Sequence, residues 1–181
     1  MRWVNRQEII GYSALGAALL LALLGWIGWT VEGEVADVPT PNVPERTYFA
    51  DDPLPEQRFS PFLNAALTLT WDRDDIYVVI VDEDEKNTCE ANPPGLFNTG
   101  GGTACTPYDA DVIAGSEDGE AGLQWDVAAG VYYAGLGTIE NELPEDTVIT
   151  LSYAVHLQAG FAAYFVFVLI GAAGFAYTKS E

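Results

Sequence analysis

The chain has 181 residues, with 27 Asp and Glu against 7 Lys and Arg, and a formal net charge of −20 at pH 7. An acid excess of this size excludes polyanionic partners, nucleic acid above all, because like charges repel. Yet 49% of the residues are hydrophobic, and the charged and apolar residues are segregated along the chain.

Two charge-free hydrophobic stretches, Ile9–Val31 and Leu157–Thr178, lie near the ends of the chain. Each is long enough for an α-helix to cross a bilayer core about 30 Å thick. Arg2 and Arg6 precede the first stretch and Lys179 follows the second, and positive charge near a span is retained on the cytoplasmic side. We therefore expect a plasma-membrane protein with two spans, both termini in the cytoplasm and the middle of the chain outside it.

A cleaved signal peptide is the alternative for the first stretch, with Arg2 and Arg6 as its basic region. The apolar part of a signal peptide usually has about 7–15 residues and ends at a small-x-small cleavage site. The stretch here is longer and runs into Gly28-Trp29-Thr30-Val31-Glu32 without such a site. An uncleaved anchor is favoured, and the middle of the chain is exported in either case.

Residues 32–154 hold 25 of the 27 acidic residues and four of the seven Lys and Arg. Three explanations remain open: adaptation to salty water, where salt screens the repulsion; binding of a cation such as calcium, which takes carboxylate oxygens; or a basic partner. The chain has only two lysines, Lys86 and Lys179, which favours salt adaptation.

Residues 32–61 contain six of the ten prolines, and proline fixes φ and removes a donor, so an extended linker is predicted there. Apolar residues then alternate along Leu63–Trp71, which indicates a half-buried strand. The continuous β-branched run Ile76–Val81 indicates a buried central strand. With the polar turn between them, these two strands are predicted to form a hairpin.

Further strands are predicted over residues 110–114, 121–127, 131–138 and 147–155, with no helix in the exported part. Six or so short strands indicate an antiparallel β-sandwich. The last strand leads into the second span with almost no linker. The expected organisation is an N-tail (1–8), transmembrane helix 1 (9–31), a Pro-rich acidic linker (32–61), an exported all-β sandwich domain (62–154), transmembrane helix 2 (155–178) and a C-tail (179–181).

The two cysteines, Cys89 and Cys105, both lie in the exported part, within a long, acidic, glycine-rich loop over residues 82–107. In an oxidising compartment they predict one disulfide, which stabilises a loop of this length by about 3 kcal/mol. A zinc site is the alternative, but a lone Cys pair without a nearby His or a second pair is a poor one.

Acidic residues at the two ends of the strand Ile76–Val81 are candidate calcium ligands. Asp82 and Asp84 follow this strand and, on a continued strand, would share one face; Asp72 and Asp74 precede it. Calcium needs six to eight oxygens, and the EF-hand pattern is absent because its glycine and final glutamate are missing. Solvated acidic loops are the alternative. No cofactor other than calcium is expected.

Small residues recur at three- and four-residue spacing in both spans, and such spacing lets helices approach closely. The candidate packing residues are Ala14, Ala18, Ala22 and Gly25 in the first span, and Gly171 and Gly174 in the second.

The segment Gly122–Tyr133 reads GLQWDVAAGVYY: a strand with Trp, a turn ending in Gly, then a strand that opens with aromatic residues. It resembles the late hairpin of two exported jelly-roll modules, the GOLD domain of emp24-type membrane proteins and the bacterial pre-peptidase C-terminal domain. The chain lacks the coiled coil and the cytoplasmic sorting tail of the emp24 proteins. The resemblance implies a protein-binding module without catalysis, and it carries no functional residue over.

No catalytic set can be assembled around His156, the only histidine, so an enzyme is not expected. The sequence favours a non-catalytic accessory or structural subunit of a larger membrane complex. Its expected partners are other integral membrane subunits and the lipid bilayer. The alternative function is a membrane-anchored, extracytoplasmic module that binds calcium or another ligand.

Overall fold

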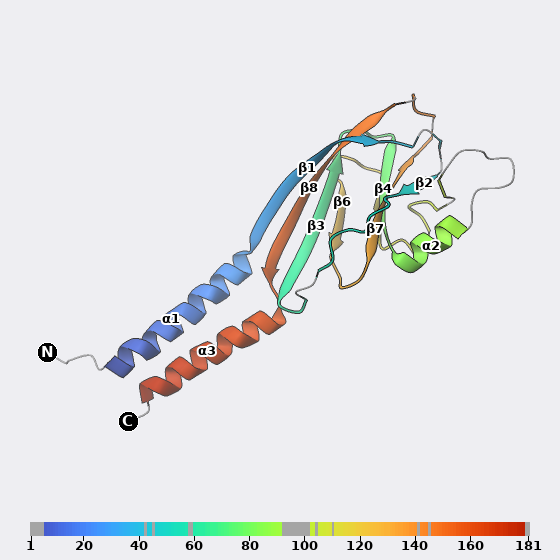
Figure 1. Ribbon diagram of the computed structural model, residues 1–181. Helices are drawn as coiled ribbons and strands as arrows, with labels where there is room; N and C mark the ends of the chain where they lie inside the picture. The colour runs from blue at the N-terminus through green and yellow to red at the C-terminus, as the bar shows by residue number, and fades with distance from the viewer. Residues whose placement is uncertain are drawn as a thin grey trace. The chain divides into compact units, whose positions relative to one another are not determined.

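The computed structural model describes residues 6–41, 43–44, 46–57, 60–91, 102–103, 105–109, 111–140, 142–144 and 146–179. Two long apolar helices lie at the ends of the chain, and antiparallel strands lie between them (Figure 1). The chain divides into two compact units. The first consists of Met1–Thr30, Phe59–Ala65 and His156–Glu181, and the second of Val31–Arg58 and Ala66–Val155.

The terminal helices are α1 (Arg6–Ile27) and α3 (Phe161–Lys179), and both are long and apolar enough to cross a membrane. Their inner boundaries differ from the predicted ones: α1 ends at Ile27 rather than at Val31, and α3 begins at Phe161 rather than at residue 155. Gly28, at φ 73°, ends α1, so that residues 29–31 belong to a strand rather than to the span. Likewise, residues 155–159 continue a strand, and Gly160 alone separates that strand from α3.

The strands among the described residues form two four-stranded sheets. The first sheet has the order β1 (Trp29–Pro39), β8 (Val148–Ala159), β3 (Leu63–Trp71), β6 (Leu123–Asp126). The second has the order β2 (Thr47–Phe49), β7 (Tyr132–Thr138), β4 (Ile76–Asp82), β5 (Ala114–Ser116). The prediction of an antiparallel β domain flanked by two helices is therefore confirmed.

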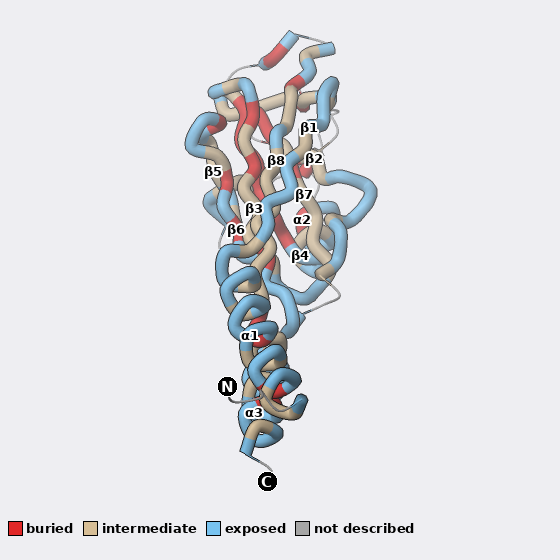
Figure 2. The backbone as a smooth tube through the Cα atoms, turned by 90° about the vertical axis from the view of Figure 1, so that its left-hand side faces the viewer, coloured by how far each residue is buried: buried red, intermediate tan, exposed pale blue. Residues whose placement is uncertain are grey.

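One hydrophobic core lies between the inner faces of the sheets, and its buried strand segments are red in Figure 2. Trp71 and Trp125 come from the first sheet, and Val78 and Ile80 from the second. Every residue of Ile76–Val81 is buried, which confirms the predicted central strand. Burial of this much apolar surface is the main favourable term in folding the domain.

The predicted hairpin of β3 and β4 is wrong, because the two strands belong to different sheets. β4 is buried on both faces and lies between β7 and β5, with Val78 opposite Leu136. β3 pairs instead with β6, with Leu67 opposite Trp125. β6 and β7 also lie in different sheets, so the segment Gly122–Tyr133 does not form the hairpin that the resemblance implied.

Two further expectations are corrected. The segment 32–61 is not a continuous linker, since it contains most of β1 and all of β2. β1 is an edge strand that is exposed along most of its length, and acidic edge strands resemble linkers in composition. The fifth strand spans Ala114–Ser116 rather than 110–114.

The acidic loop contains a helix, α2 (Glu83–Ala91), where the sequence predicted none. Asp82 caps it, because its Oδ1 accepts a hydrogen bond from the backbone N–H of Glu85 at 2.8 Å. Lys86 and Glu90, four residues apart on the helix, form an ion pair at 2.6 Å. These local interactions and the buried Cys89 hold α2 despite its low hydrophobicity.

Candidate functional site

The small residues of the two long helices lie where α1 and α3 touch. A Cβ added at Gly174 would lie 2.8 Å from Ala14 Cβ and 2.9 Å from the carbonyl oxygen of Gly11. A Cβ added at Gly171 would lie 3.5 Å from Ala18 Cβ. Glycine at both positions therefore lets the two backbones approach closely, as small residues do between helices in membranes.

The other two candidates on α1, Ala22 and Gly25, lie toward its C-terminal end. Ala22 is half-buried. A Cβ added at Gly25 would meet Ala159 at the end of β8, 2.6 Å away, as well as the ring of Phe167 on α3 at 3.5 Å. The small-residue stripe thus contacts the end of a strand in addition to the second helix.

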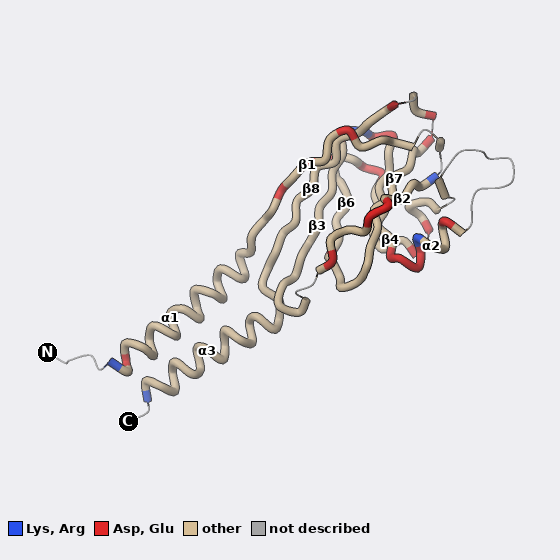
Figure 3. The backbone as a smooth tube through the Cα atoms, in the orientation of Figure 1, with Lys and Arg blue, Asp and Glu red and all other residues tan. Residues whose placement is uncertain are grey.

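Much of the remaining backbone of both helices is exposed, as the pale blue segments of Figure 2 show, and many of its exposed side chains are large and apolar. No charged residue lies in α1 after Glu8 or in α3 before Lys179 (Figure 3). The largest exposed side chains include Leu19, Leu20, Leu23, Leu24, Phe165, Val168 and Leu169. Such a surface requires an apolar environment, which lipid or other apolar helices can supply.

The C-terminal end of α1 is hydrogen-bonded to the end of β8. The side-chain Nε2 of Gln158 donates a hydrogen bond to the carbonyl oxygen of Trp26 at 2.9 Å. Thr30 Oγ1 and His156 Nδ1 lie 2.9 Å apart, within hydrogen-bond distance. The last carbonyls of a helix have no partner within the helix. Gln158 provides a hydrogen-bond donor for one of them, that of Trp26. His156 thus lies in a polar contact between strand ends.

The first residues of α3 are capped by a turn that lies far away in the sequence. The N–H of Gly160 donates to the carbonyl oxygen of Phe62 at 2.7 Å, and the N–H of Ala162 donates to that of Pro61 at 3.4 Å. A Cβ at Gly160 would lie 2.1 Å from the oxygen of Pro61. Only glycine fits there. Sequence reasoning missed this contact, because nothing local to either segment signals it.

Cys89 and Cys105 form the predicted disulfide, which joins α2 to the segment after Thr103. Glu85 Oε1 lies 3.5 Å from Cys89 Sγ and 3.8 Å from Cys105 Sγ. Burial raises the pKa of Glu85 above its ordinary value, and the charges of Asp111, Asp109 and Asp82 raise it further. Although these three residues have metal-ligand chemistry, both sulfurs are committed to the disulfide and cannot bind zinc as thiolates.

The four candidate calcium ligands are not brought together. Asp72 and Asp74 lie before β4, and Asp82 and Asp84 lie at or beyond its other end, about 20 Å away at the rise of a seven-residue strand. Asp84 is on α2 rather than on a strand, and helix residues two apart do not face each other. Asp82 is occupied as the cap of α2.

The turn between β3 and β4 contains its own positive charge. Arg73 donates two hydrogen bonds to the carboxylate of Asp75, at 2.7 and 2.6 Å. This hydrogen bonding lowers the pKa of Asp75. Asp72 Oδ1 accepts a hydrogen bond from the N–H of Thr150 at 3.1 Å. The positive charge of the Arg73 guanidinium thus neutralises part of the negative charge of this turn, which makes the turn a weaker site for a calcium ion.

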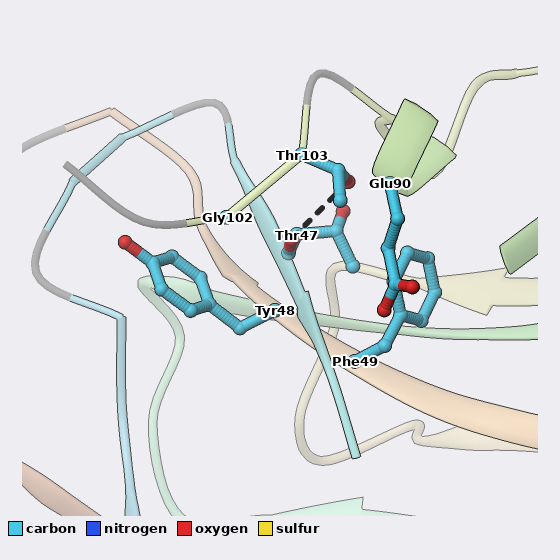
Figure 4. Close-up of a pocket in the computed structure, with 6 residues that line it drawn as sticks. All are labelled: Thr47, Tyr48, Phe49, Glu90, Gly102 and Thr103. Carbon is cyan, nitrogen blue, oxygen red and sulfur yellow. Dashed lines mark hydrogen bonds between the residues drawn. The ribbon is translucent and has the colours of Figure 1, made fainter. Parts of the chain in front are cut away.

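A hollow of about 220 Å³ lies beside β2 (Figure 4). Its described lining consists of Thr47, Tyr48, Phe49, Glu90, Gly102 and Thr103. Thr103 Oγ1 donates to the carbonyl oxygen of Thr47 at 3.2 Å, and Glu90 is paired with Lys86. Tyr48 and Phe49 point to opposite sides of β2. The hydroxyl of Thr47 likewise donates to a backbone carbonyl, that of Cys105, so within the described lining neither threonine hydroxyl is hydrogen-bonded to the carboxylate of Glu90, as an activated nucleophile would require.

Comparisons with known proteins add little. No protein-family model matches the chain, and no curated protein matches it. Among solved structures, the chain resembles PliG of Aeromonas hydrophila, a periplasmic inhibitor of g-type lysozyme, at 12% identity over 72% of this chain and 86% of that one, with a TM-score of 0.26. It also resembles the SPBc2 prophage-derived protein YomS, at 12% identity over 72% of this chain and 96% of that one, with a TM-score of 0.26. Scores this low carry no argument about function.

Proposed function

We propose that the chain is a non-catalytic accessory or structural subunit of a larger membrane complex. Its two helices cross the plasma membrane, and its acidic β domain lies on the extracytoplasmic side. One observation carries the proposal: the helices contact each other through small residues, and their remaining faces are apolar, uncharged and exposed.

The lengths of the helices support the membrane assignment. At 1.5 Å per residue, the 22 residues of α1 span about 33 Å and the 19 residues of α3 about 28 Å. Both values are close to the thickness of a bilayer core, about 30 Å. Gly11 lies against Thr178, so Arg6 and Lys179 lie at the same end of the pair. The positive-inside rule puts that end in the cytoplasm.

The outward faces of the helices support the role of a subunit. On α3 this face carries Phe165, Val168 and Leu169, all exposed. Bulky side chains of this kind pack against lipid or against another subunit. Because no charged residue that could bind or conduct an ion lies in α1 after Glu8 or in α3 before Lys179, a transport path within this chain alone is not supported. The helices then serve as anchors and as packing surfaces.

The test is to extract the native complex in mild detergent and identify its components by mass spectrometry. We expect the chain to co-purify reproducibly with other integral membrane proteins. The double variant Phe165→Ala/Leu169→Ala should release them, and the surface variant Tyr108→Ala on the β domain should not. Recovery of the wild-type chain only as a monomer would contradict the proposal.

A calcium- or ligand-binding module is the second candidate, and it is supported by one observation. Burial, and then the charges of Asp111, Asp109 and Asp82, raise the pKa of Glu85, so these acidic groups act on one another within one region of the β domain. A calcium ion bound to the folded chain would raise its melting temperature in proportion to the logarithm of the calcium concentration. A calcium titration of the full chain in detergent that leaves the melting temperature unchanged removes this candidate.

A further inference from the structure

We propose that the turn over residues 60–62 is a third membrane-contacting element of this chain. It holds Phe62 in the outer headgroup region of the bilayer that α1 and α3 cross. This inference rests on the transmembrane assignment made above, and it adds a contact between the middle of the chain and the lipid surface.

The hydrogen bonds of the turn fix its depth. The carbonyl oxygen of Phe62 accepts from Gly160 N–H at 2.7 Å, and Phe161, the next residue, is the first of α3. With Lys179 at the cytoplasmic boundary, the length of about 28 Å puts Phe161 at the opposite boundary of the bilayer core. Phe62 is therefore held at the outer membrane surface.

The side chains around this level are aromatic and exposed. Trp26 is 71% exposed, Trp29 73%, Phe161 83% and Phe62 50%. All four belong to the first compact unit, as does Leu63, which is 37% exposed. Aromatic residues gather at membrane–water interfaces, and removing an exposed phenylalanine from water is favourable. Headgroups and the outer acyl segments cover these side chains without a further protein.

The turn is fixed at this position by close contact. Ala162 N–H donates to the carbonyl oxygen of Pro61 at 3.4 Å, and the Cα of Gly160 is so near that oxygen that a Cβ would lie 2.1 Å from it. The free N–H groups at the start of a helix are costly at a membrane boundary unless they are bonded. Swinging the turn away from the lipid would leave them without these acceptors.

The experiment measures how deeply the turn lies in a bilayer. Phe62→Cys provides one reactive thiol, because Cys89 and Cys105 are joined in a disulfide. The full chain is spin-labelled at this thiol in phosphatidylcholine nanodiscs. The collision of the label with oxygen, which concentrates in lipid, is compared with its collision with a water-soluble nickel chelate. Phe165→Cys serves as the lipid reference, and Tyr108→Cys, 78% exposed on the β domain, as the water reference.

We expect the label at position 62 to collide with the nickel chelate several-fold less often than the label at position 108. A label at position 62 that behaves like the one at position 108, while position 165 is lipid-like, overturns the inference and leaves the transmembrane assignment intact. Water-like behaviour at position 165 as well overturns both.

A second measurement tests the cap itself. Gly160→Ala puts a methyl group against the carbonyl oxygen of Pro61 and should shift the label at position 62 toward water. Gly16→Ala on α1 is the matched control, because a Cβ there meets nothing within 4 Å, and it should leave the label unchanged. Equal behaviour of the two variants would show that the contact at Gly160 does not hold the turn, which contradicts the inference.

Discussion

Replacing Gly174 with isoleucine should separate the two long helices. Its added Cβ alone would lie 2.8 Å from Ala14 Cβ and 2.9 Å from the oxygen of Gly11. One of these obstacles is backbone and the other is a methyl group fixed to it, so neither can rotate away. The helices must move apart by roughly 1 Å to restore an ordinary carbon–carbon contact of about 3.5–4.0 Å.

The size of the effect follows from this displacement. A gap of about 0.5–1 Å forfeits a quarter to a half of the attraction between facing atoms, and overpacking a tight contact typically costs about 1–3 kcal/mol. Because 1.4 kcal/mol is a factor of ten in an equilibrium constant, the population of closely packed helices should fall by roughly 5- to 150-fold. Gly16→Ile on the exposed side of α1 is the matched control, since a Cβ there has open space.

Disulfide cross-linking measures the approach of the helices directly. An ideal Cβ at Gly171 lies 3.5 Å from Ala18 Cβ, within the Cβ–Cβ range of a disulfide of about 3.5–4.5 Å. The pair Ala18→Cys/Gly171→Cys should therefore oxidise readily in nanodiscs, as read by mass spectrometry of the joined peptides. The rate should fall at least several-fold with Gly174→Ile and hardly change with Gly16→Ile. Equal rates in the two backgrounds would refute the packing derived above.

Three further predictions concern the β domain, each measured by unfolding the full chain in detergent. Ile80→Ala removes a fully buried side chain and should cost about 2–5 kcal/mol, whereas Val148→Ala, at an exposed site, should change stability by well under 1 kcal/mol; similar losses would contradict the core assignment. Cys89→Ser/Cys105→Ser should cost about 3 kcal/mol for a sequence separation of 16, and reduction of the wild-type chain should match it. The folded pKa of Glu85 is raised above 4.5, so the stabilisation due to this group is present below that pH and is lost as pH rises through the raised value. Glu85→Gln should then be more stable relative to wild type near pH 7 than near pH 4; a difference that does not vary with pH would refute it.

Where local residues alone decide the structure, the sequence predicted it well. The β-branched run Ile76–Val81 has no polar residue to expose, so it had to be a buried central strand, and it is. The two cysteines left one pairing within the chain, and it forms. Most of each charge-free stretch near the two ends forms a long helix, as the sequence predicted. An uninterrupted apolar run of this length favours a helix, because a helix satisfies its own backbone hydrogen bonds.

Pairing between distant segments could not be read from the sequence. The run Leu63–Trp71 alternates as expected, but alternation shows only which face is buried and not which strand lies alongside. Its nearest neighbour in sequence was the obvious partner, yet the structure pairs Leu67 with Trp125. β1 was not predicted because its first residues continue the apolar stretch, and the rest of the strand includes Glu32, Glu34 and Asp37. Charged residues of this kind are common in linkers and in exposed edge strands alike.

The helix α2 is a different case, because a local signal for it exists. Asp82 at the cap position is followed three residues later by Glu85, the spacing of a capping box. Lys86 and Glu90 then have the four-residue spacing of a helical ion pair. A helix was not predicted here because the segment has no apolar stripe at helical spacing, and Cys89 is the only residue of α2 that is buried.

The two glycines at the junctions explain why the boundary of the helical unit does not fall at the helix ends. Gly28 turns the chain from α1 into β1 in a single residue, and Gly160 does the same between β8 and α3. Without a linker, the free backbone groups at each helix end must be bonded by residues in, or directly beside, the ends of the strands. The side chain of Gln158 donates to a free carbonyl at the end of α1, and the carbonyl of Phe62 accepts from the free N–H of Gly160 before α3. The unit formed by the long helices therefore includes the ends of three strands, and a partner that packs on the helices at this end would meet strand residues as well as the two helices.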